Sequence, residues 1–300
     1  MPKLPVIVAP MFLVSTPQMV IESGRAGVIG SFPLLNARPA EECAKWLVEV
    51  KEALGDIPWA VNFISHRGSN KRYDEDVELI REHKPPIVIT SLGSPAEVLE
   101  IVHGYGGLVY SDVANVKHAK KAAQSGVDGL ILVCAGAGGH GGTLNPFAFI
   151  AAVKKFFDGT IILSGSLSTG QDVAAALLMG ADYAYMGTRF LAVEESSAPE
   201  DYKQMVIDSS IEDILYTDSF SGVPVNVLIP SLEKQGIDPK TLKPKKDVDL
   251  SHLVNAKAWR DIWSAGHGVT TVTKRETVKE AVRQLEQEYD EGVKALVRND

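Results

Sequence analysis

A steady alternation of short apolar runs with longer amphipathic stretches is the feature of this sequence that most constrains its fold. Eight of the runs are rich in residues that favour β-strands, and all of them precede residue 190. These runs are Pro5–Ala9, Gly27–Ser31, Trp59–Ile64, Ile87–Ser91, Gly107–Ser111, Gly129–Cys134, Thr160–Ser164 and Tyr183–Met186. The stretches between them have helical periodicity. They cover 16–25, 40–54, 73–83, 95–103, 114–125, 146–157 and 170–179.

Strands that are apolar along their whole length are typical of a parallel sheet covered on both faces. Eight strands joined by helices match the (β/α)₈, or TIM, barrel in number and size. A doubly wound open sheet is the alternative, but the even order of the eight units favours the barrel. We therefore expect an α/β fold, a (β/α)₈ barrel with a lid insertion after strand eight.

The alternation stops after residue 195. Residues 196–250 have weak periodicity, and prolines such as Pro230, Pro239 and Pro244 interrupt them. We expect three parts: a barrel at 1–195, a lid insertion over one barrel end at 196–258, and a C-terminal return to the barrel at 259–300. Near and within that return we expect a helix at Ala256–Ser264, a glycine turn at Gly266–Val269 and a final outer helix at Lys274–Leu296.

Composition and charge exclude several classes of protein. The 300 residues are 45% hydrophobic, which is enough for a large core, and the net charge of −8 with no Lys/Arg-rich run argues against a nucleic-acid partner. The apolar runs are too short to span a bilayer, and the first residues lack the apolar core of a signal peptide. Neither the two cysteines nor the seven histidines have disulfide or metal spacing. We therefore expect a cytoplasmic protein with no membrane partner and no metal.

A histidine among glycines is the most informative local motif. Residues 136–143 contain His140 between two glycine pairs, directly after the apolar run 129–134. Active sites of barrels lie where strands end. Glycines allow the backbone to approach a ligand, and an imidazole can transfer a proton near neutral pH. We therefore favour a catalytic role for His140 over a structural one. The motif does not fit a dinucleotide-binding fingerprint, because the acidic residue expected about 20 positions later is missing.

Polar and glycine residues also follow the last two strands. Ser164, Gly165 and Ser166 end strand seven, and Gly187 and Thr188 end strand eight. Backbone N–H groups at such positions often bind phosphate in barrels. The alternative is that the glycines only form tight turns.

Four further residues at strand ends have a functional and a structural interpretation. Asn62, inside an apolar strand, could orient a planar heterocycle or bridge loops. Asp112 could act as an ionisable site group or cap the next helix. Met11 could pack on a flat ring or plug the barrel end. For Cys134 we favour a small buried apolar group over a nucleophile.

Together, these motifs give the chain a family resemblance over nearly its whole length. The matching segments are Ala9-Pro10-Met11, Val61-Asn62, Ala137 to Gly141, Leu163 to Gly165, Ala184 to Leu191 and Trp263 to Gly266. With these segments the chain resembles the nitronate monooxygenase (2-nitropropane dioxygenase) family of FMN-dependent barrels. The glycine–histidine loop and the Met-Gly-Thr-Arg-Phe segment are the most specific part of the match.

The resemblance implies FMN at the carboxyl ends of the strands and a substrate beside His140. The implied cofactor-binding residues are Ala9, Pro10, Met11, Asn62, Asp112, Gly138, Gly139, Ser164, Gly165, Ser166, Gly187 and Thr188. The chain departs from the family in two places. Asp112 stands where many relatives have a lysine near the flavin, and His267 stands in Gly266-His267-Gly268 where many have Gly-Gln-Gly. Asp112 would not stabilise an anionic flavin as a lysine would.

These features predict a flavin-dependent oxidoreductase that oxidises alkyl nitronates or nitroalkanes with O₂. The first alternative is a reductase of quinones or enoyl thioesters that uses NAD(P)H on the same barrel. A barrel that binds a phosphate ligand without redox chemistry, and a flavin-binding protein without turnover, are more remote. The physiological substrate, the role of His267 and the existence of a homodimer stay open.

Overall fold

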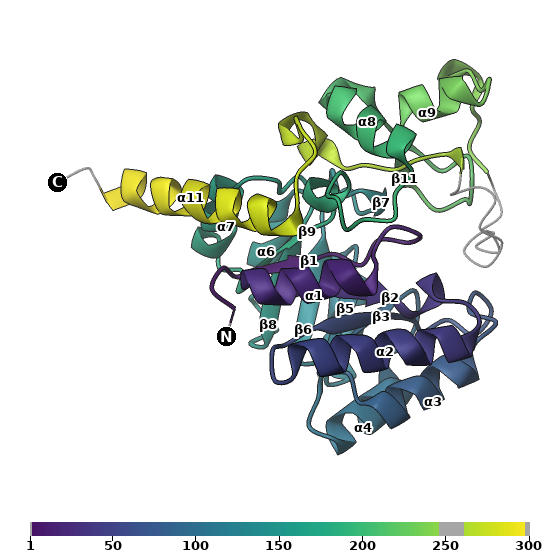
Figure 1. Cartoon of the computed structure of the whole chain (residues 1–300), viewed down its shortest axis with the longest axis vertical. Coiled ribbons are helices and arrows are strands. Elements are labelled where there is room, and N and C mark those ends of the chain that lie inside the picture. The colour runs from purple at the N-terminus through teal and green to yellow at the C-terminus, as the bar shows by residue number, and fades with distance from the viewer. Residues whose placement is uncertain (1, 246–260, 298–300) are drawn as a thin grey trace.

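The computed structural model describes residues 2–245 and 261–297, and eight parallel strands form its centre (Figure 1). Their order around the sheet is β1-β9-β8-β6-β5-β4-β3-β2. The strands are β1 Val6–Val8, β2 Ser31–Pro33, β3 Ala60–Ile64, β4 Ile87–Ser91, β5 Leu108–Val113, β6 Gly129–Val133, β8 Thr160–Ser164 and β9 Tyr183–Met186. Three of these, β4, β8 and β9, have the bounds that the sequence predicts.

The sheet closes between β1 and the residues that precede β2. Ile7 and Ile29 form a parallel bridge. The Val8 N–H donates to the Ile29 carbonyl at 2.8 Å, and the Ile29 N–H donates to the Val6 carbonyl at 3.0 Å. The (β/α)₈ barrel predicted from the sequence is therefore confirmed.

The second strand lies later in the chain than expected. Gly27 ends the preceding helix in a left-handed conformation (φ 98°), and its N–H donates to the carbonyls of Ser23 and Gly24. Gly30 lies so close to that helix that a Cβ there would approach the Val20 Cα to 2.6 Å. Because these glycines serve the helix end and its packing, the ladder to β3 begins only at Ser31.

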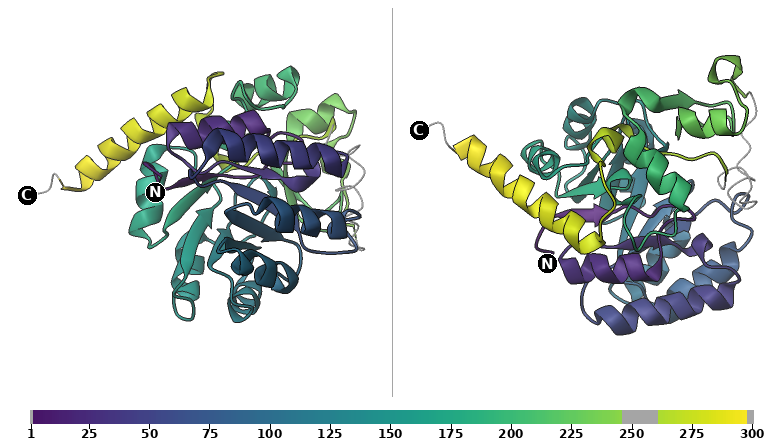
Figure 2. Two further views of the ribbon diagram at one scale, coloured as in Figure 1. Left: turned by 60° about the horizontal axis from the view of Figure 1, so that its bottom comes forward. Right: turned by 45° about the horizontal axis from the view of Figure 1, so that its top comes forward.

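Helices follow the strands and surround the barrel (Figure 2). They are α1 Pro17–Ala26, α2 Ala40–Leu54, α3 Tyr73–His83, α4 Ala96–Gly104, α5 Val116–Gln124, α6 Pro146–Val153 and α7 Gly170–Leu178. Side-chain caps fix the N-termini of some of these helices. The Thr16 hydroxyl accepts from the Met19 N–H, and Thr169 and Asp172 form a capping box at α7.

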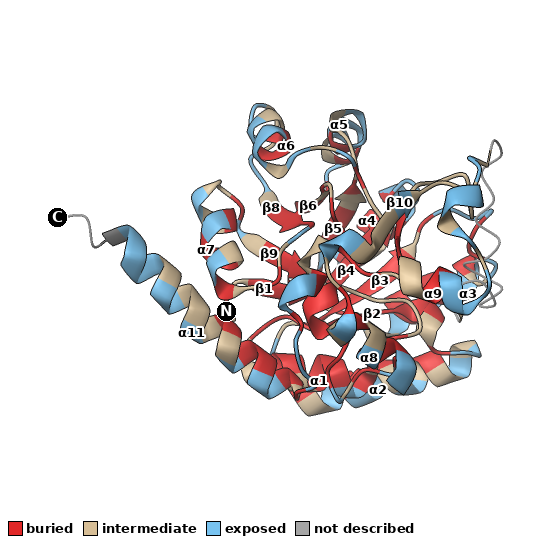
Figure 3. Cartoon of the chain, turned by 90° about the horizontal axis from the view of Figure 1, so that it is seen from above, coloured by how far each residue is buried: buried red, intermediate tan, exposed pale blue. Residues whose placement is uncertain are grey.

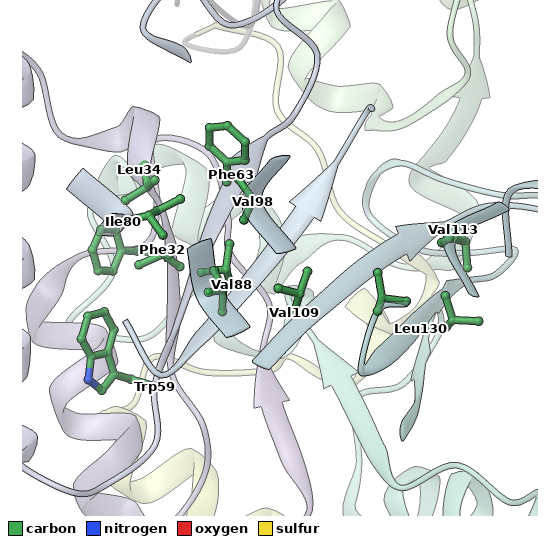
Figure 4. Packing of buried hydrophobic residues seen from close by; sticks show 14 of the residues in the cluster. Phe32, Leu34, Trp59, Phe63, Ile80, Val88, Val98, Val109, Val113 and Leu130 are labelled. Atoms are coloured by element: carbon green, nitrogen blue, oxygen red, sulfur yellow. The ribbon is translucent and has the colours of Figure 1, made fainter. Parts of the chain in front are cut away.

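Side chains alternate between the barrel interior and the surrounding helices. The interior is filled by Ile7, Ile29, Ala60, Ile87, Ile89, Tyr110, Ile131, Ile162 and Tyr185. The outward residues of the same strands, such as Val61, Val88 and Leu130, pack against the helices (Figure 4). Viewed from above, most residues of the barrel strands are buried (Figure 3). This double burial explains why the strands appear in the sequence as continuous apolar runs.

The segment after the barrel strands is more regular than expected. It contains the helices α8 Glu200–Asp208 and α9 Ile229–Lys234 and the strands β10 Ile214–Thr217 and β11 Val225–Leu228. β10 and β11 form an antiparallel sheet with β7, Gly139–His140. Elements this short do not produce a clear hydrophobic period, which explains the weak periodicity of the sequence in this segment.

The last part of the chain returns to the barrel. Of the helix expected at Ala256–Ser264, residues 256–260 lie outside the described residues, and 262–264 are not helical. Instead of a simple glycine turn, a short 3₁₀ helix, η6, covers His267–Thr271. The final helix α11, Val278–Val297, packs against α7 and α1, and its far half extends beyond the barrel (Figure 1).

A buried ion pair ties this return to the end of β9. Arg189 and Glu276 are each only 4% exposed, and the Arg189 guanidinium donates to the Glu276 carboxylate. Replacing Glu276 with alanine should lower the free energy of unfolding by about 3–5 kcal/mol, because the buried guanidinium loses its carboxylate. The matched control is Arg275→Ala, which breaks an exposed pair with Glu200 and should cost less than about 1 kcal/mol. Urea denaturation measures the loss of unfolding free energy in each variant. Equal losses in the two variants would contradict a stabilising role for the buried pair of Arg189 and Glu276.

Candidate functional site

A cavity of about 900 Å³ opens where the barrel strands end. Its lining includes every site residue that the sequence predicts: Ala9, Pro10, Met11, Asn62, Asp112, Gly138, Gly139, His140, Ser164, Gly165, Ser166, Gly187 and Thr188. They meet there because the carboxyl ends of parallel strands share one rim. The remaining question is what each group can do at that rim.

The ends of β8 and β9 offer a row of backbone donors, which we call the phosphate cradle (Ser164, Gly165, Ser166, Gly187 and Thr188). Within the described chain, the N–H groups of Gly165, Ser166, Gly187 and Thr188 donate to no protein acceptor. Gly165 has φ 114°, and Ser166 adopts φ 61°, which is uncommon outside glycine. Unpaired N–H groups that converge in a turn are suited to an anion such as phosphate.

The two glycines of the cradle are glycine for different reasons. A Cβ on Gly165 would approach the carbonyl oxygens of Cys134 and Ala135 to 3.0 Å, so the protein itself requires that glycine. Gly187 has φ −104°, and a Cβ there would make only ordinary contacts of 3.5 Å with Ala9 and Met11. Nothing in the chain demands glycine at position 187, whereas a bound phosphate or ring would. This residue therefore fits a ligand such as a flavin.

The glycine–histidine loop packs backbone to backbone against the C-terminal return. A Cβ on Gly138 would approach the Gly266 nitrogen to 2.9 Å, and Gly139 adopts φ 73°. The Gly266 N–H donates to the Thr188 hydroxyl at 2.8 Å. Close chain packing and a left-handed turn therefore already account for Gly138 and Gly139.

His140 is half-buried and lies on β7, opposite Val225 of β11. Its Nε2 lies 3.2 Å from the Ser221 Oγ. The Ser221 hydroxyl donates to the Val223 carbonyl at 2.9 Å, so it accepts from the imidazole N–H. That arrangement places a proton on Nε2. A histidine held in this way can serve as a base at the cavity wall.

Residues that the sequence analysis did not assign to the site hold this loop in place. The Gly139 N–H donates to the Ser264 hydroxyl at 2.7 Å, and the Asn226 amide donates to the Ala137 carbonyl at 2.6 Å. The Ser264 N–H donates in turn to the Tyr202 hydroxyl at 3.2 Å, and the Tyr202 ring stacks on Trp263 with centroids 4.9 Å apart. Residues of the segment after β9 and of the C-terminal return thus set the position of the histidine.

A chain of polar side chains crosses the barrel mouth from β3 to β5. The Asn62 amide donates to the Ile89 carbonyl at 3.2 Å and to the Ser91 hydroxyl at 2.7 Å. The Ser91 hydroxyl donates to Asp112 Oδ2 at 2.5 Å. Asn62 therefore links strands β3 and β4, whereas its structural interpretation was a bridge between loops. The helix-cap interpretation of Asp112 is wrong, because Asn115 caps α5.

Asp112 is held in an environment that disfavours its charge. Burial raises the pKa of Asp112 to about 6, against the opposing effect of the Ser91 hydrogen bond. Its Oδ1 atom is shielded from solvent and has no hydrogen-bond partner among the described residues, and the same is true of the Tyr185 hydroxyl. Burial, followed by the Asp112 charge, raises the pKa of Tyr185 well above its ordinary value. These two polar atoms are available to a ligand that enters the barrel mouth.

The remaining candidates have structural roles or lie outside the cavity. Cys134 is fully buried, its thiol donates to the Leu132 carbonyl, and burial raises its pKa to about 12, so it is not a nucleophile. His267 is not among the residues that line the cavity. Across residues 2–245 and 261–297, no cluster of three or more His, Cys, Asp or Glu side chains could hold a metal ion. No helix in that part of the chain is long and apolar enough to span a membrane.

Comparison with known proteins places these features in a family. A family model described as nitronate monooxygenase matches residues 28–288. The nitronate monooxygenase of Paraburkholderia phytofirmans is 26% identical, over 97% of this chain and 94% of the relative. An indene-carboxyl-CoA dehydrogenase of Rhodococcus jostii is 27% identical, over 77% of this chain and 65% of the relative.

The fold has a similar counterpart among solved structures. The nitroalkane oxidase of Streptomyces ansochromogenes superimposes with a TM-score of 0.84 at 24% identity, covering 98% of both chains. At that identity the superposition supports the fold, while the family model carries the assignment.

Proposed function

Because the chain belongs to the nitronate monooxygenase family of flavin-dependent oxidoreductases, we propose that it oxidises alkyl nitronates or nitroalkanes with O₂ and that its flavin is FMN. The observation that carries this proposal is the meeting, in one cavity, of the phosphate cradle with a histidine held by Ser221. The phosphate cradle suits the phosphate of a flavin, and the histidine suits removal of the acidic proton on the carbon next to a nitro group.

Different residues of the cavity would contact different parts of the FMN molecule. The cradle N–H groups would hold the FMN phosphate, with Gly187 leaving room for it. Ala9, Pro10 and Met11 would line the isoalloxazine ring, with Gly138 and Gly139 beside it. Asn62 and Asp112 would face the polar edge of the ring. Bound FMN would supply the electron transfer to O₂, which no protein side chain provides.

His140 would handle the proton. A neutral nitroalkane must lose its α-proton before oxidation, whereas a nitronate has already lost it. The His140 imidazole would accept that proton, and the Ser221 hydroxyl would hold the ring in place. The protonated ring would then pair with the anionic nitro group.

We also propose that the segment 196–258, of which residues 246–258 lie outside the described residues, provides a lid over the cavity. Among the described residues of this segment, Tyr202 and Val223 line the cavity, and Ser221 holds His140. A cover of this kind limits the size of the substrate and excludes water from the flavin.

The function is tested by mixing the purified flavin-containing protein with ethyl nitronate in air. We expect O₂ consumption and nitrite release with the nitronate, and slower turnover with nitroethane at the same pH. Absence of turnover with both forms, in a protein that contains its flavin, would reject the proposed reaction.

A reductase is the second candidate, and one observation favours it. A relative over three quarters of the chain is named a carboxyl-CoA dehydrogenase, so the family scaffold is found beside thioester substrates. Anaerobic mixing with NADH and with NADPH separates the two functions. Rapid bleaching of the flavin by either donor, with no turnover of nitronate, would favour reduction of an enoyl thioester or a quinone.

Asp112 should make the reduction of the flavin depend on pH. Above a pH of about 6 this carboxyl is ionised, and its charge disfavours further negative charge in the cavity. Below that pH the Asp112 carboxyl is neutral, so it no longer disfavours negative charge on the reduced flavin. Asp112→Asn should therefore raise the reduction potential of the flavin at pH 8, by about 30 mV for a tenfold effect on a two-electron couple, and leave it nearly unchanged at pH 5.

Spectroelectrochemical titration at both pH values measures the shift. Asp158→Asn, which removes an exposed carboxylate near the opposite barrel end, should leave the potential unchanged at both. An equal shift at pH 5 and pH 8 would show that Asp112 acts through something other than its charge.

A further inference from the structure

His267, which departs from the family pattern, has no role in the proposed function. It lies in the C-terminal return between Gly266 and Gly268, and both of these glycines belong to the cavity lining. The residue is partly exposed, and its imidazole forms no hydrogen bond or ion pair within residues 2–245 and 261–297. A side chain in this position can therefore interact with a ligand at the rim.

The His267 imidazole lies beside the phosphate cradle. The His267 N–H donates to the Gly136 carbonyl at 2.9 Å, which joins the C-terminal return to the glycine–histidine loop. A Cβ on Gly136 would collide with the Ser166 hydroxyl and would approach the His267 Nδ1 to 2.8 Å. The imidazole and the Ser166 hydroxyl therefore meet over the same glycine, and Ser166 is one of the cradle residues.

The cavity lining near the cradle supplies no positive charge. Among the described residues from Ser164 onward, the lining contains no Lys, Arg, His, Asp or Glu. Arg189 directly follows the cradle in sequence, but its guanidinium is buried in the pair with Glu276. A phosphate monoester carries about 1.5 to 2 negative charges at pH 7, and the chain as a whole has a net charge of −8. A phosphate in the cradle would therefore be stabilised by a nearby cation.

The helix that follows the cradle does not supply this charge either. The first N–H groups of a helix often bind phosphate in barrels. In α7 the N–H groups of Ser168 and Thr169 each donate to the Asp172 carboxylate at 2.8 Å. The Gly170 N–H donates to the Glu288 carboxylate at 2.8 Å. Because two carboxylates already occupy this helix end, positive charge for the phosphate has to come from another segment.

We propose that the protonated His267 imidazole pairs with the flavin phosphate in the cradle and so selects FMN over flavins that lack a phosphate monoester. An imidazole gains its charge near neutral pH, and a neighbouring anion favours the charged form. The neutral N–H groups of the cradle would orient the phosphate, and His267 would offset its charge. This assignment rests on the proposed FMN cofactor and adds a specificity-determining residue to the site.

The test compares two flavins on the full chain after its own flavin has been removed by dialysis. FMN carries the phosphate and riboflavin lacks it, so their dissociation constants, measured by flavin fluorescence, isolate the contribution of the phosphate. We expect His267→Gln, which removes the charge, to weaken FMN binding about tenfold, the effect of losing one charge-assisted hydrogen bond. Riboflavin binding should stay unchanged. His267→Lys restores a positive charge and should regain most of the FMN affinity.

The matched control is His103→Gln, which makes the same replacement at an exposed imidazole that pairs with Asp128 outside the cavity. It should leave the dissociation constants of both flavins unchanged. Added salt should weaken FMN binding more in the parent protein than in His267→Gln, because salt screens a charge pair at the rim. Circular dichroism reports whether each variant is folded.

The outcomes separate the role of His267 from the identity of the cofactor. A parent protein that binds neither flavin would reject both FMN as the cofactor and the pairing with His267. If the parent binds FMN but His267→Gln loses equal affinity for FMN and riboflavin, the cofactor stands and the role of His267 is overturned. A His267→Lys protein that binds FMN no better than His267→Gln would also overturn it, because a positive charge at this position would then not strengthen binding.

Discussion

Replacing Gly187 with leucine should strip the flavin from an otherwise folded protein. A Cβ at this position makes only ordinary contacts with Ala9 and Met11, so the chain tolerates it, but the rest of the leucine would occupy the space proposed for the phosphate or the ring. An overpacked site costs about 1–3 kcal/mol, so flavin affinity should fall by about tenfold to a hundredfold or more. The parent protein should be yellow and release FMN, not FAD, on denaturation.

The flavin-to-protein ratio after gel filtration measures the loss, and circular dichroism reports the fold. Gly104→Leu is the matched control. Gly104 ends α4 outside the cavity lining, and a side chain there would meet nothing within 4 Å. A colourless parent protein that does not take up FMN would reject FMN as the cofactor. A Gly187→Leu protein with full flavin content would show that the flavin phosphate and ring do not occupy the space beside Gly187.

The barrel could be predicted from sequence because its strands are buried on both faces. Continuous apolar runs such as Ile87–Ser91 and Thr160–Ser164 mark strands without any knowledge of their partners. The second strand is the exception. The run Gly27–Ser31 is apolar because Val28 and Ile29 are buried, but its glycines serve helix α1, so the paired strand begins at its last residue.

The rim residues could also be found, because topology alone brings strand ends together. A residue such as Asn62 or Gly187 needs only its place at the end of a strand to be assigned to the rim. What each residue contacts could not be found in this way. The sequence left Asp112 between a site group and a helix cap. The structure excludes the cap because Asn115 caps α5, and it shows that Asp112 accepts from Ser91 of a neighbouring strand.

The residues that hold the histidine loop were missed for a different reason. Ser221 is 81 positions from His140, and Ser264 is 125 positions from Gly139. Both contact the loop from segments whose strands and helices are too short to show a period. Serine is also common on protein surfaces, so neither residue carries a signal of its own.

The role of His140 can be tested by its effect on two forms of one substrate. We expect His140→Ala to keep its flavin and to lose about a hundredfold or more of its activity on a neutral nitroalkane, the range for loss of a general base. The loss on the preformed nitronate should be smaller, because the proton that His140 would remove is already gone. Steady-state rates on nitroethane and ethyl nitronate at one pH measure both losses.

His103→Ala is the matched control, since that imidazole pairs with Asp128 at an exposed position outside the cavity. It should leave both rates unchanged. Equal losses on the two substrate forms in His140→Ala would assign the histidine to substrate binding instead of proton transfer. Unchanged rates with intact flavin would give His140 a structural role, in which it pairs with Ser221 and lies opposite Val225 of β11.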